Sequence, residues 1–164
     1  MILLDTNILS TFARIDRFDL LYDIFEDSQL YISPNVYMEI KHAEIIGYIH
    51  AKKVIDALDQ EKITIIHLSR QAKKEIPSLP KSFGKGELDS VAIAKSNKSI
   101  FITNEKKVVN YCQKNQIDVI TLNSLLRYLW EEKILTKQQV KDLIDEIELK
   151  DRLVITAKKE IFDE

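Results

Sequence analysis

The stretch MILLDTN, residues 1–7, decides the fold class of this 164-residue chain. Its apolar run Ile2–Leu4 is uninterrupted, which is typical of a strand covered on both faces inside a parallel sheet. The run ends at Asp5, and ligands in open α/β sheets bind just beyond the carboxyl ends of such strands. Asp5 is therefore the first candidate functional residue, although an Asp at this position could equally cap a helix that includes Ile8.

Strand and helix patterns alternate along the rest of the chain. Short apolar runs predict further strands at Leu30–Ile32, Thr64–Leu68, Ser99–Ile102 and Asp118–Leu122. Helical spacing of apolar residues predicts helices at Ile8–Ala13, Phe18–Phe25, from Ser33-Pro34 onward, Tyr48–Gln60, Glu87–Ser96, Asn104–Asn115, Leu125–Trp130 and from Thr136 onward. Such alternation implies βαβ units around a mostly parallel sheet.

The expected architecture is a single α/β unit, a three-layer α/β/α sandwich with a mostly parallel central sheet. All of these predicted strands and helices lie within residues 1–130, except the helix that begins at Thr136. Residues 131–164 are expected to form a C-terminal helical extension packed on the same domain. Within this extension Leu153–Ile155 has the pattern of a short strand.

Composition excludes several classes of protein. The chain is 45% hydrophobic and 30% charged, which favours a globular protein over a disordered one. Its single cysteine, Cys112, cannot form an internal disulfide, as is usual in a reducing cytoplasm. Asp5 interrupts the first apolar run before a signal peptide could form, and no apolar stretch approaches the roughly 18 residues of a membrane span. We therefore expect a cytoplasmic protein without a membrane partner.

Charge is distributed unevenly along the chain. The formal net charge is −2, which does not by itself indicate a nucleic-acid-binding protein. The connector between the third predicted strand and the next helix is nevertheless basic, and it is opposed only by Glu75. A solvated helix face would explain this run, and so would contact with an RNA backbone. The candidate RNA-binding residues are Arg70, Lys73, Lys74, Lys81 and Lys85.

Acidic residues recur at strand ends and on apolar helix faces. Asp5 and Glu105 follow strands that should lie parallel, so both should reach the same edge of the sheet. Glu39 lies at the edge of a buried helical stripe. Glu87 and Asp89 are two residues apart and should point to different sides of their helix. Asp89 is the preferred member of this pair, because Glu87 stands at the predicted helix start, where it would face solvent.

Carboxylates gathered in one cleft repel one another, and a divalent cation relieves that repulsion. Mg²⁺ and Mn²⁺ prefer carboxylate oxygen and water, and the chemistry they support is phosphodiester hydrolysis. His42, His50 and His67 lack metal-ligand spacing, which disfavours zinc. Each acid also has a structural explanation as a helix cap or a favourable first-turn charge, so the joint placement carries the hypothesis rather than any one residue.

Four segments together resemble the PIN-domain ribonucleases, the fold of the VapC-type toxins of toxin–antitoxin pairs. They are LLDTNIL at Leu3–Leu9, Glu39 within NVYMEI, GELDSVAIA at Gly86–Ala94, and ITNE at Ile102–Glu105. They occur in the order of the family, and the resemblance covers about residues 1–130 of this chain.

The resemblance implies a PIN-like fold and an acidic quartet, Asp5, Glu39, Asp89 and Glu105, that binds Mg²⁺ or Mn²⁺. In this interpretation Asp5, Asp89 and Glu105 are metal ligands, and Glu39 completes the shell or orients the attacking water. Thr103 resembles the hydroxyl that commonly precedes the last acid, and Glu87 is an accessory candidate. Glu105 is a departure, because the family usually has Asp at this position.

The leading functional hypothesis is a metal-dependent endoribonuclease that hydrolyses single-stranded or structured RNA. Such a protein would be the toxin of a toxin–antitoxin pair, would bind a small antitoxin protein and would form a homodimer. The alternative is a catalytically weak PIN-like module that binds nucleic acid or a partner protein. A receiver-type phosphoacceptor domain fits less well, because the third predicted strand ends in His67-Leu68-Ser69. A haloacid-dehalogenase-type phosphatase would need Asp where Asn7 stands.

Overall fold

The computed structural model describes residues 1–163, so Glu164, the last residue of the expected extension, lies outside the described residues. Five short strands form one sheet in the order β3-β2-β1-β4-β5, and every neighbouring pair is parallel. The predicted α/β class is therefore confirmed, with β1 at the centre of the sheet. The strands are β1 (Ile2–Leu4), β2 (Leu30–Ile32), β3 (Ile63–Ile65), β4 (Ile100–Ile102) and β5 (Val119–Ile120).

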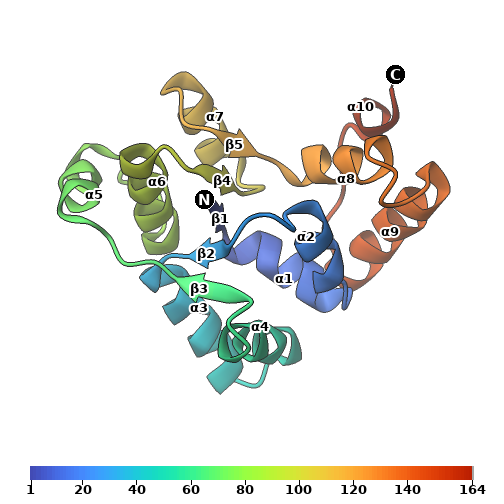
Figure 1. Cartoon of the computed structure of the whole chain (residues 1–164), viewed down its shortest axis with the longest axis horizontal. Coiled ribbons are helices and arrows are strands. Elements are labelled where there is room, and N and C mark those ends of the chain that lie inside the picture. The colour runs from blue at the N-terminus through green and yellow to red at the C-terminus, as the bar shows by residue number, and fades with distance from the viewer. Residues whose placement is uncertain (164) are drawn as a thin grey trace.

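Helices cover both faces of this sheet, as the three-layer prediction requires (Figure 1). Ile2 and Leu4 of β1 face one hydrophobic cluster, and Leu3 faces the other. The first cluster involves α1 (Thr6–Arg14), α2 (Phe18–Ile24), α3 (Pro34–Ile45), α4 (Ile49–Asp59), α8 (Leu122–Glu131), α9 (Lys137–Lys150) and α10 (Lys158–Phe162). The second involves α5 (Arg70–Glu75), the 3₁₀ turn η1 (Ile76–Ser78), α6 (Lys85–Asn97) and α7 (Lys106–Lys114).

Local capping chemistry explains where several helices begin. The Ser33 hydroxyl accepts a hydrogen bond from the amide of Val36 at 3.3 Å, and Pro34 occupies the first helical position of α3. Thr136 opens α9 through a capping box with Gln139. Gly47, with a φ of +95°, makes the turn between α3 and α4, a conformation that side-chain-bearing residues rarely adopt. These local signals are readable in the sequence because they involve residues close in the chain.

The prediction of a strand at Leu153–Ile155 is wrong. The Ile155 amide donates to Glu148 Oε1 of α9 at 3.0 Å, and the Asn123 side chain of α8 donates to the Thr156 carbonyl at 2.9 Å. Side chains therefore satisfy this backbone where a strand would need a neighbouring strand. The segment crosses from α9 to α10 as an irregular link, and it keeps Ile155 buried.

The C-terminal helices share the core of the sheet. Ile144 and Ile147 of α9 and Ile161 of α10 belong to the same buried cluster as Ile2 of β1. The Trp130 indole also donates to the Ile161 carbonyl at 2.7 Å. Figure 1 shows α8, α9 and α10 gathered on the right of the molecule, and α5 and α6 on the left. Among residues 1–163, the structure contains no helix long and apolar enough to cross a membrane.

We expect Ile147→Ala to lower the free energy of unfolding of the whole chain by about 2–4 kcal/mol, because it opens a cavity in the shared core. Urea unfolding should remain one cooperative transition. Leu149→Ala is the matched control on the same helix: Leu149 is 79% exposed, so its loss should change stability by less than about 0.5 kcal/mol. Two separate transitions, with only the smaller one shifted by Ile147→Ala, would show that the extension folds independently.

Candidate functional site

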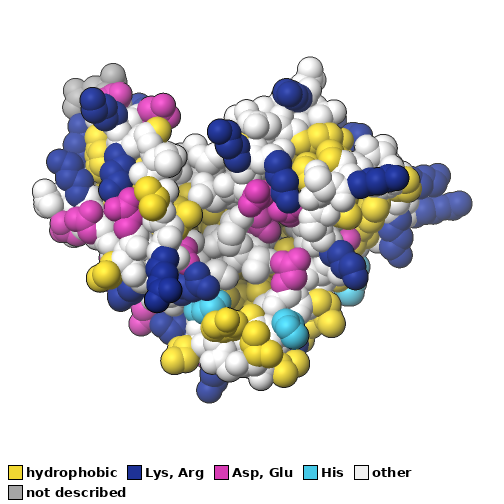
Figure 2. Space-filling model, turned by 180° about the vertical axis from the view of Figure 1, so that it is seen from behind, with side chains coloured by type: hydrophobic (Ala, Val, Ile, Leu, Met, Phe, Trp, Pro, Cys, Tyr) yellow, Lys and Arg dark blue, Asp and Glu magenta, His cyan; other side chains and the backbone are white. Residues whose placement is uncertain are grey.

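A cleft of about 440 Å³ opens at the carboxyl ends of β1 and β4. Its floor is formed by the first turns of α1, and its walls by α3, the start of α6, the residues after β4 and the segment after α9. Figure 2 shows acidic side chains near the middle of one face of the molecule, with Lys and Arg side chains around them. The acidic lining residues are Asp5, Glu39, Glu87, Glu105 and Asp151.

Asp5 is both the helix cap and the centre of the acidic group. Its carboxylate accepts hydrogen bonds from the Thr6 amide at 2.9 Å, the Thr103 hydroxyl at 2.6 Å and the Asn7 side chain at 3.0 Å. Burial, aided by the nearby charges of Glu87 and Glu39, raises the pKa of this carboxyl to about 6 despite the lowering effect of the hydrogen bonds from Thr103 and Thr6. The pocket therefore resists a further negative charge unless a cation is supplied.

Thr103 and Asn7 connect the end of β1 to the end of β4. The fully buried Thr103 hydroxyl donates to Asp5 and accepts from the Glu105 amide at 3.2 Å. Asn7 Oδ1 accepts from the Asn104 amide at 3.3 Å while its Nδ2 donates to Asp5. Thr103 is a predicted accessory residue, whereas the sequence pattern gave Asn7 no role in the site. Asn7 stands two residues after Asp5, at the start of the helix, and this position could have indicated that its side chain reaches Asp5.

Glu39 enters the cleft from α3. Its Oε2 accepts from the Thr6 hydroxyl at 2.5 Å, and its Oε1 accepts from the Gly86 amide at 3.3 Å. A Cβ atom on Gly86 would meet Glu39 Oε1 at 2.9 Å, closer than real Cβ contacts come, and Val36 Cγ2 at 3.0 Å, which is also tight. Glycine at this position therefore lets the first turn of α6 approach α3 closely enough for its amide to bind Glu39.

Glu87, and not Asp89, lines the cleft. Glu87 Oε2 accepts from the Gly84 amide at 2.7 Å and pairs with Lys107 Nζ at 3.2 Å. The buried Asp89 instead accepts from Asn35, through the backbone amide at 3.2 Å and the side chain at 2.7 Å. Asp89 thus fastens the start of α3 to α6 and does not line the cleft, whereas the sequence pattern favoured it over Glu87.

The position of Glu87 follows from where α6 begins. The sequence pattern placed the helix start at Glu87, but the helix begins at Lys85 and Glu87 is its third residue. At that position the side chain folds back over the helix terminus and accepts a hydrogen bond from the Gly84 amide. This arrangement turns Glu87 into the cleft and leaves Asp89 on the side that packs against α3.

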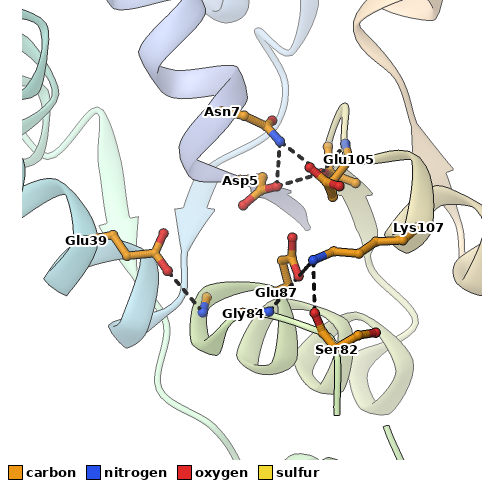
Figure 3. Close-up of polar contacts among 10 residues, drawn as sticks. Asp5, Asn7, Glu39, Ser82, Gly84, Glu87, Glu105 and Lys107 are labelled. Carbon is orange, nitrogen blue, oxygen red and sulfur yellow. Dashed lines mark hydrogen bonds and ion pairs between the residues drawn. The ribbon is translucent and has the colours of Figure 1, made fainter. Parts of the chain in front are cut away.

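Glu105 completes the acidic group from the turn after β4. It is the residue immediately before α7, is half-buried and lines the cleft. In Figure 3, Asp5, Glu87 and Glu105 lie around one space, and Glu39 lies at its side beside the start of α6. The structure therefore brings together three of the four predicted catalytic residues and the accessory Glu87, each from a different part of the chain.

The donor set fits a hard divalent cation in chemistry. The cleft offers carboxylates, hydroxyls and amide oxygens, and no His or Cys lines it. Within residues 1–163, no three acidic, His or Cys side chains lie close enough to hold an ion directly as they stand. Mg²⁺ usually keeps several waters and is bound through one or two carboxylates, so a cleft of this volume and charge suits a hydrated ion. The residues placed to hold it are Asp5, Glu87 and Glu105, with Glu39 beside them.

The predicted RNA-binding residues lie outside the cleft. Arg70, Lys73 and Lys74 are exposed on α5, and Lys81 is exposed in the loop before α6. Lys85 begins α6 next to Gly84, so it is the member of this group nearest the acidic residues along the chain. Figure 2 shows Lys and Arg side chains projecting from the right-hand edge, which corresponds to the α5 side of Figure 1.

The raised pKa of Asp5 predicts a pH-dependent stability in the absence of metal. A carboxyl with a pKa of about 6, against 3.8 in the unfolded chain, binds its proton more tightly when the protein is folded. Its stabilising contribution is therefore complete below about pH 4 and is lost as the pH rises to about 6. We expect the free energy of unfolding of the wild type minus that of Asp5→Asn to fall by about 2–3 kcal/mol across this window.

Urea unfolding at a series of pH values, in EDTA, measures this difference, and other titrating groups cancel because both proteins contain them. A difference that stays flat or rises between about pH 4 and pH 6 would contradict the raised pKa.

Comparison with known proteins agrees with this geometry. A family model described as a PIN domain matches residues 1–159, which includes α9 and most of the expected extension. A search of curated proteins found no match. PIN domains are generally nucleases and typically use divalent metals. With a match over nearly its whole length and a parallel sheet flanked by helices, the chain belongs to the PIN-domain family.

Proposed function

We propose that this protein is a Mg²⁺- or Mn²⁺-dependent endoribonuclease that cleaves single-stranded or structured RNA. The observation that carries the proposal is the convergence of Asp5, Glu39, Glu87 and Glu105, from four parts of the chain, on one cleft. Asp5 is buried there with a raised pKa, although burial of a carboxylate costs stability. A cluster that is costly to the fold and open to solvent is typical of a functional site.

The roles proposed for the residues follow from their contacts. Asp5, Glu87 and Glu105 would hold the cation, which when bound would lower the pKa of the attacking water and neutralise charge developing on the phosphate. Thr103 and Asn7 orient Asp5 by donating to its Oδ2. Glu39, fixed by Thr6 and the Gly86 amide, would accept a hydrogen bond from the attacking water and orient it.

A direct test compares single-stranded RNA cleavage by the wild type with Mn²⁺, with EDTA, and by three variants. Asp5→Asn and Glu87→Gln should each lower kcat/KM by at least about 100-fold, more than the usual loss from an outer-shell residue. Asp89→Asn should keep the activity of the folded protein within about threefold and lower stability by about 1 kcal/mol, because it weakens only the contact to Asn35.

Cleavage that persists in EDTA or in Asp5→Asn would overturn the proposal. If folded Asp89→Asn loses as much activity as Glu87→Gln, Asp89 faces the cation in the working enzyme and the assignment of Glu87 fails.

We further propose that the basic residues of α5 and the following loop bind the RNA backbone away from the cleft. Lys73→Ala combined with Lys74→Ala should weaken RNA binding at every sequence alike. It should also reduce the slope of log affinity against log salt by about 0.7 for each phosphate that these lysines neutralise in the wild type. Fluorescence anisotropy with a short labelled RNA at several salt concentrations measures this. An unchanged slope would exclude these two lysines from the RNA path.

The proposal extends to a cytoplasmic toxin with a small antitoxin and a homodimeric state. Its structural support is a group of exposed apolar side chains where α3 meets α4, at the bottom of Figure 2, a kind of surface that often marks a protein interface. They are Ile45, Ile46, Tyr48 and Ile49, between 53% and 77% exposed. A neighbouring reading frame for a short DNA-binding protein would support the antitoxin, and a monomeric mass by light scattering would exclude the dimer.

The second candidate is a module that binds nucleic acid or a partner and cleaves poorly. Two observations favour it: no three metal-binding side chains are preassembled within residues 1–163, and Lys107 already neutralises Glu87. Calorimetry with Mn²⁺ separates the two candidates. Binding in or below the millimolar range supports the nuclease, and no binding in that range supports the module.

A further inference from the structure

We propose that Lys107 binds the RNA phosphate at the cleavage site, exchanging its ion pair with Glu87 for the substrate when the cation occupies the acidic group. The inference rests on the proposed function and adds to it a residue that contacts the substrate. It also couples the binding of the metal to the binding of RNA.

Lys107 reaches the acidic group from the first turn of α7. Its Nζ lies 3.2 Å from Glu87 Oε2 and 3.0 Å from the Ser82 carbonyl oxygen. Figure 3 shows the side chain extending from α7 toward Glu87 and Ser82, beside the space that Asp5 and Glu105 also face. The ammonium thus lies at the rim of the cleft and not in its floor.

The contacts of Lys107 are of a kind that exchanges readily. The Lys107 side chain is 43% exposed and that of Glu87 is 16% exposed, so water reaches the pair from the lysine side. Ion pairs this open to solvent contribute about 0–1 kcal/mol, which a new anionic partner can replace. The ammonium has three donors on a flexible stem, and a phosphate oxygen can take the place of a carboxylate oxygen without movement of the helix.

Arg14, a cation that lines the cleft, is fixed more firmly than Lys107. Arg14 lines the cleft and pairs with Asp151, whose side chain is 7% exposed and also accepts from the Thr11 hydroxyl. Breaking that pair would leave a buried carboxylate without its cation, which is costly. Arg14 therefore serves the packing of the C-terminal segment on α1, and of these two cations Lys107 is the one that can change partners.

Metal and lysine compete for the same carboxylate. A cation that draws on Glu87 removes the partner of Lys107, and the two positive charges then repel one another. A phosphate in the cleft relieves that repulsion, because it offers oxygens to both. The exchange predicts that Lys107 opposes metal binding in the absence of RNA and promotes cleavage in its presence.

The test uses Lys107→Met, which keeps the apolar stem, Lys107→Arg, which keeps the charge, and Lys114→Met as the control. Lys114 is an exposed lysine in the last turn of the same helix. The full-length proteins are compared by calorimetry with Mn²⁺ alone and by kcat/KM for a short RNA. Circular dichroism melting confirms that each variant is folded.

Lys107→Met should bind Mn²⁺ about 2- to 5-fold more tightly than the wild type, the change that loss of a pair worth up to about 1 kcal/mol produces. Its kcat/KM should fall by about tenfold or more, the loss expected for a charge-assisted hydrogen bond to phosphate. Lys107→Arg should recover much of the cleavage, and Lys114→Met should stay within about twofold of the wild type in both measurements.

Two results would overturn the proposal. Weaker Mn²⁺ binding together with slower cleavage in Lys107→Met would show that the lysine only holds Glu87 in place. Unchanged cleavage with tighter Mn²⁺ binding would show that it never contacts the substrate. Failure of the proposed function is distinguishable from both, because the wild type itself would then neither bind Mn²⁺ nor cleave RNA, and the role of Lys107 would fall with it.

Discussion

The hydrogen bond from the Thr103 hydroxyl to Asp5 is the contact on which the acidic cleft depends. It joins two residues 98 positions apart, and it can form only because β1 and β4 are adjacent parallel strands that end at the same edge. Burial of the Asp5 carboxylate is unfavourable, and the donors from Thr103, Thr6 and Asn7 offset part of that cost. The chain thereby keeps a carboxylate of raised proton affinity in the lining of the cleft.

Much of the fold was predictable because its signals are local. Every predicted strand within the sheet exists, although β3 and β5 are shorter than their apolar runs, Thr64–Leu68 and Asp118–Leu122. Caps at Ser33 and Thr136 depend on residues three positions apart. The prediction of a strand at Leu153–Ile155 failed because the partners of this backbone are not local. The apolar pattern is that of a strand, but side chains of α8 and α9 bind the backbone of this segment, and no local pattern reveals them.

The site was predictable only in part, because helix phase decides which side chain faces a cleft. Asp5 and Glu105 follow from strand ends, whose direction a parallel sheet fixes. Glu87 and Asp89 are separated by about 200° around a helix, so only one of the two can face the cleft, and the sequence pattern does not show which. Neither a strand end nor a helix pattern in the sequence indicated that Lys107 and Arg14 lie beside the acidic residues. Their partners, Glu87 and Asp151, are 20 and 137 residues away in the chain.

The contact between α1 and the C-terminal segment gives the cleft a definite shape. The first turn of α1 lies beside the acidic residues of the cleft. The last turns of the same helix contain Thr11 and Arg14, which bind Asp151. One helix of nine residues, about 13 Å long, is therefore the floor of a trough, and Asp151 and Leu153 form its end wall. Any ligand held at the acidic residues and extending along this floor would therefore meet the C-terminal segment at the far end of α1.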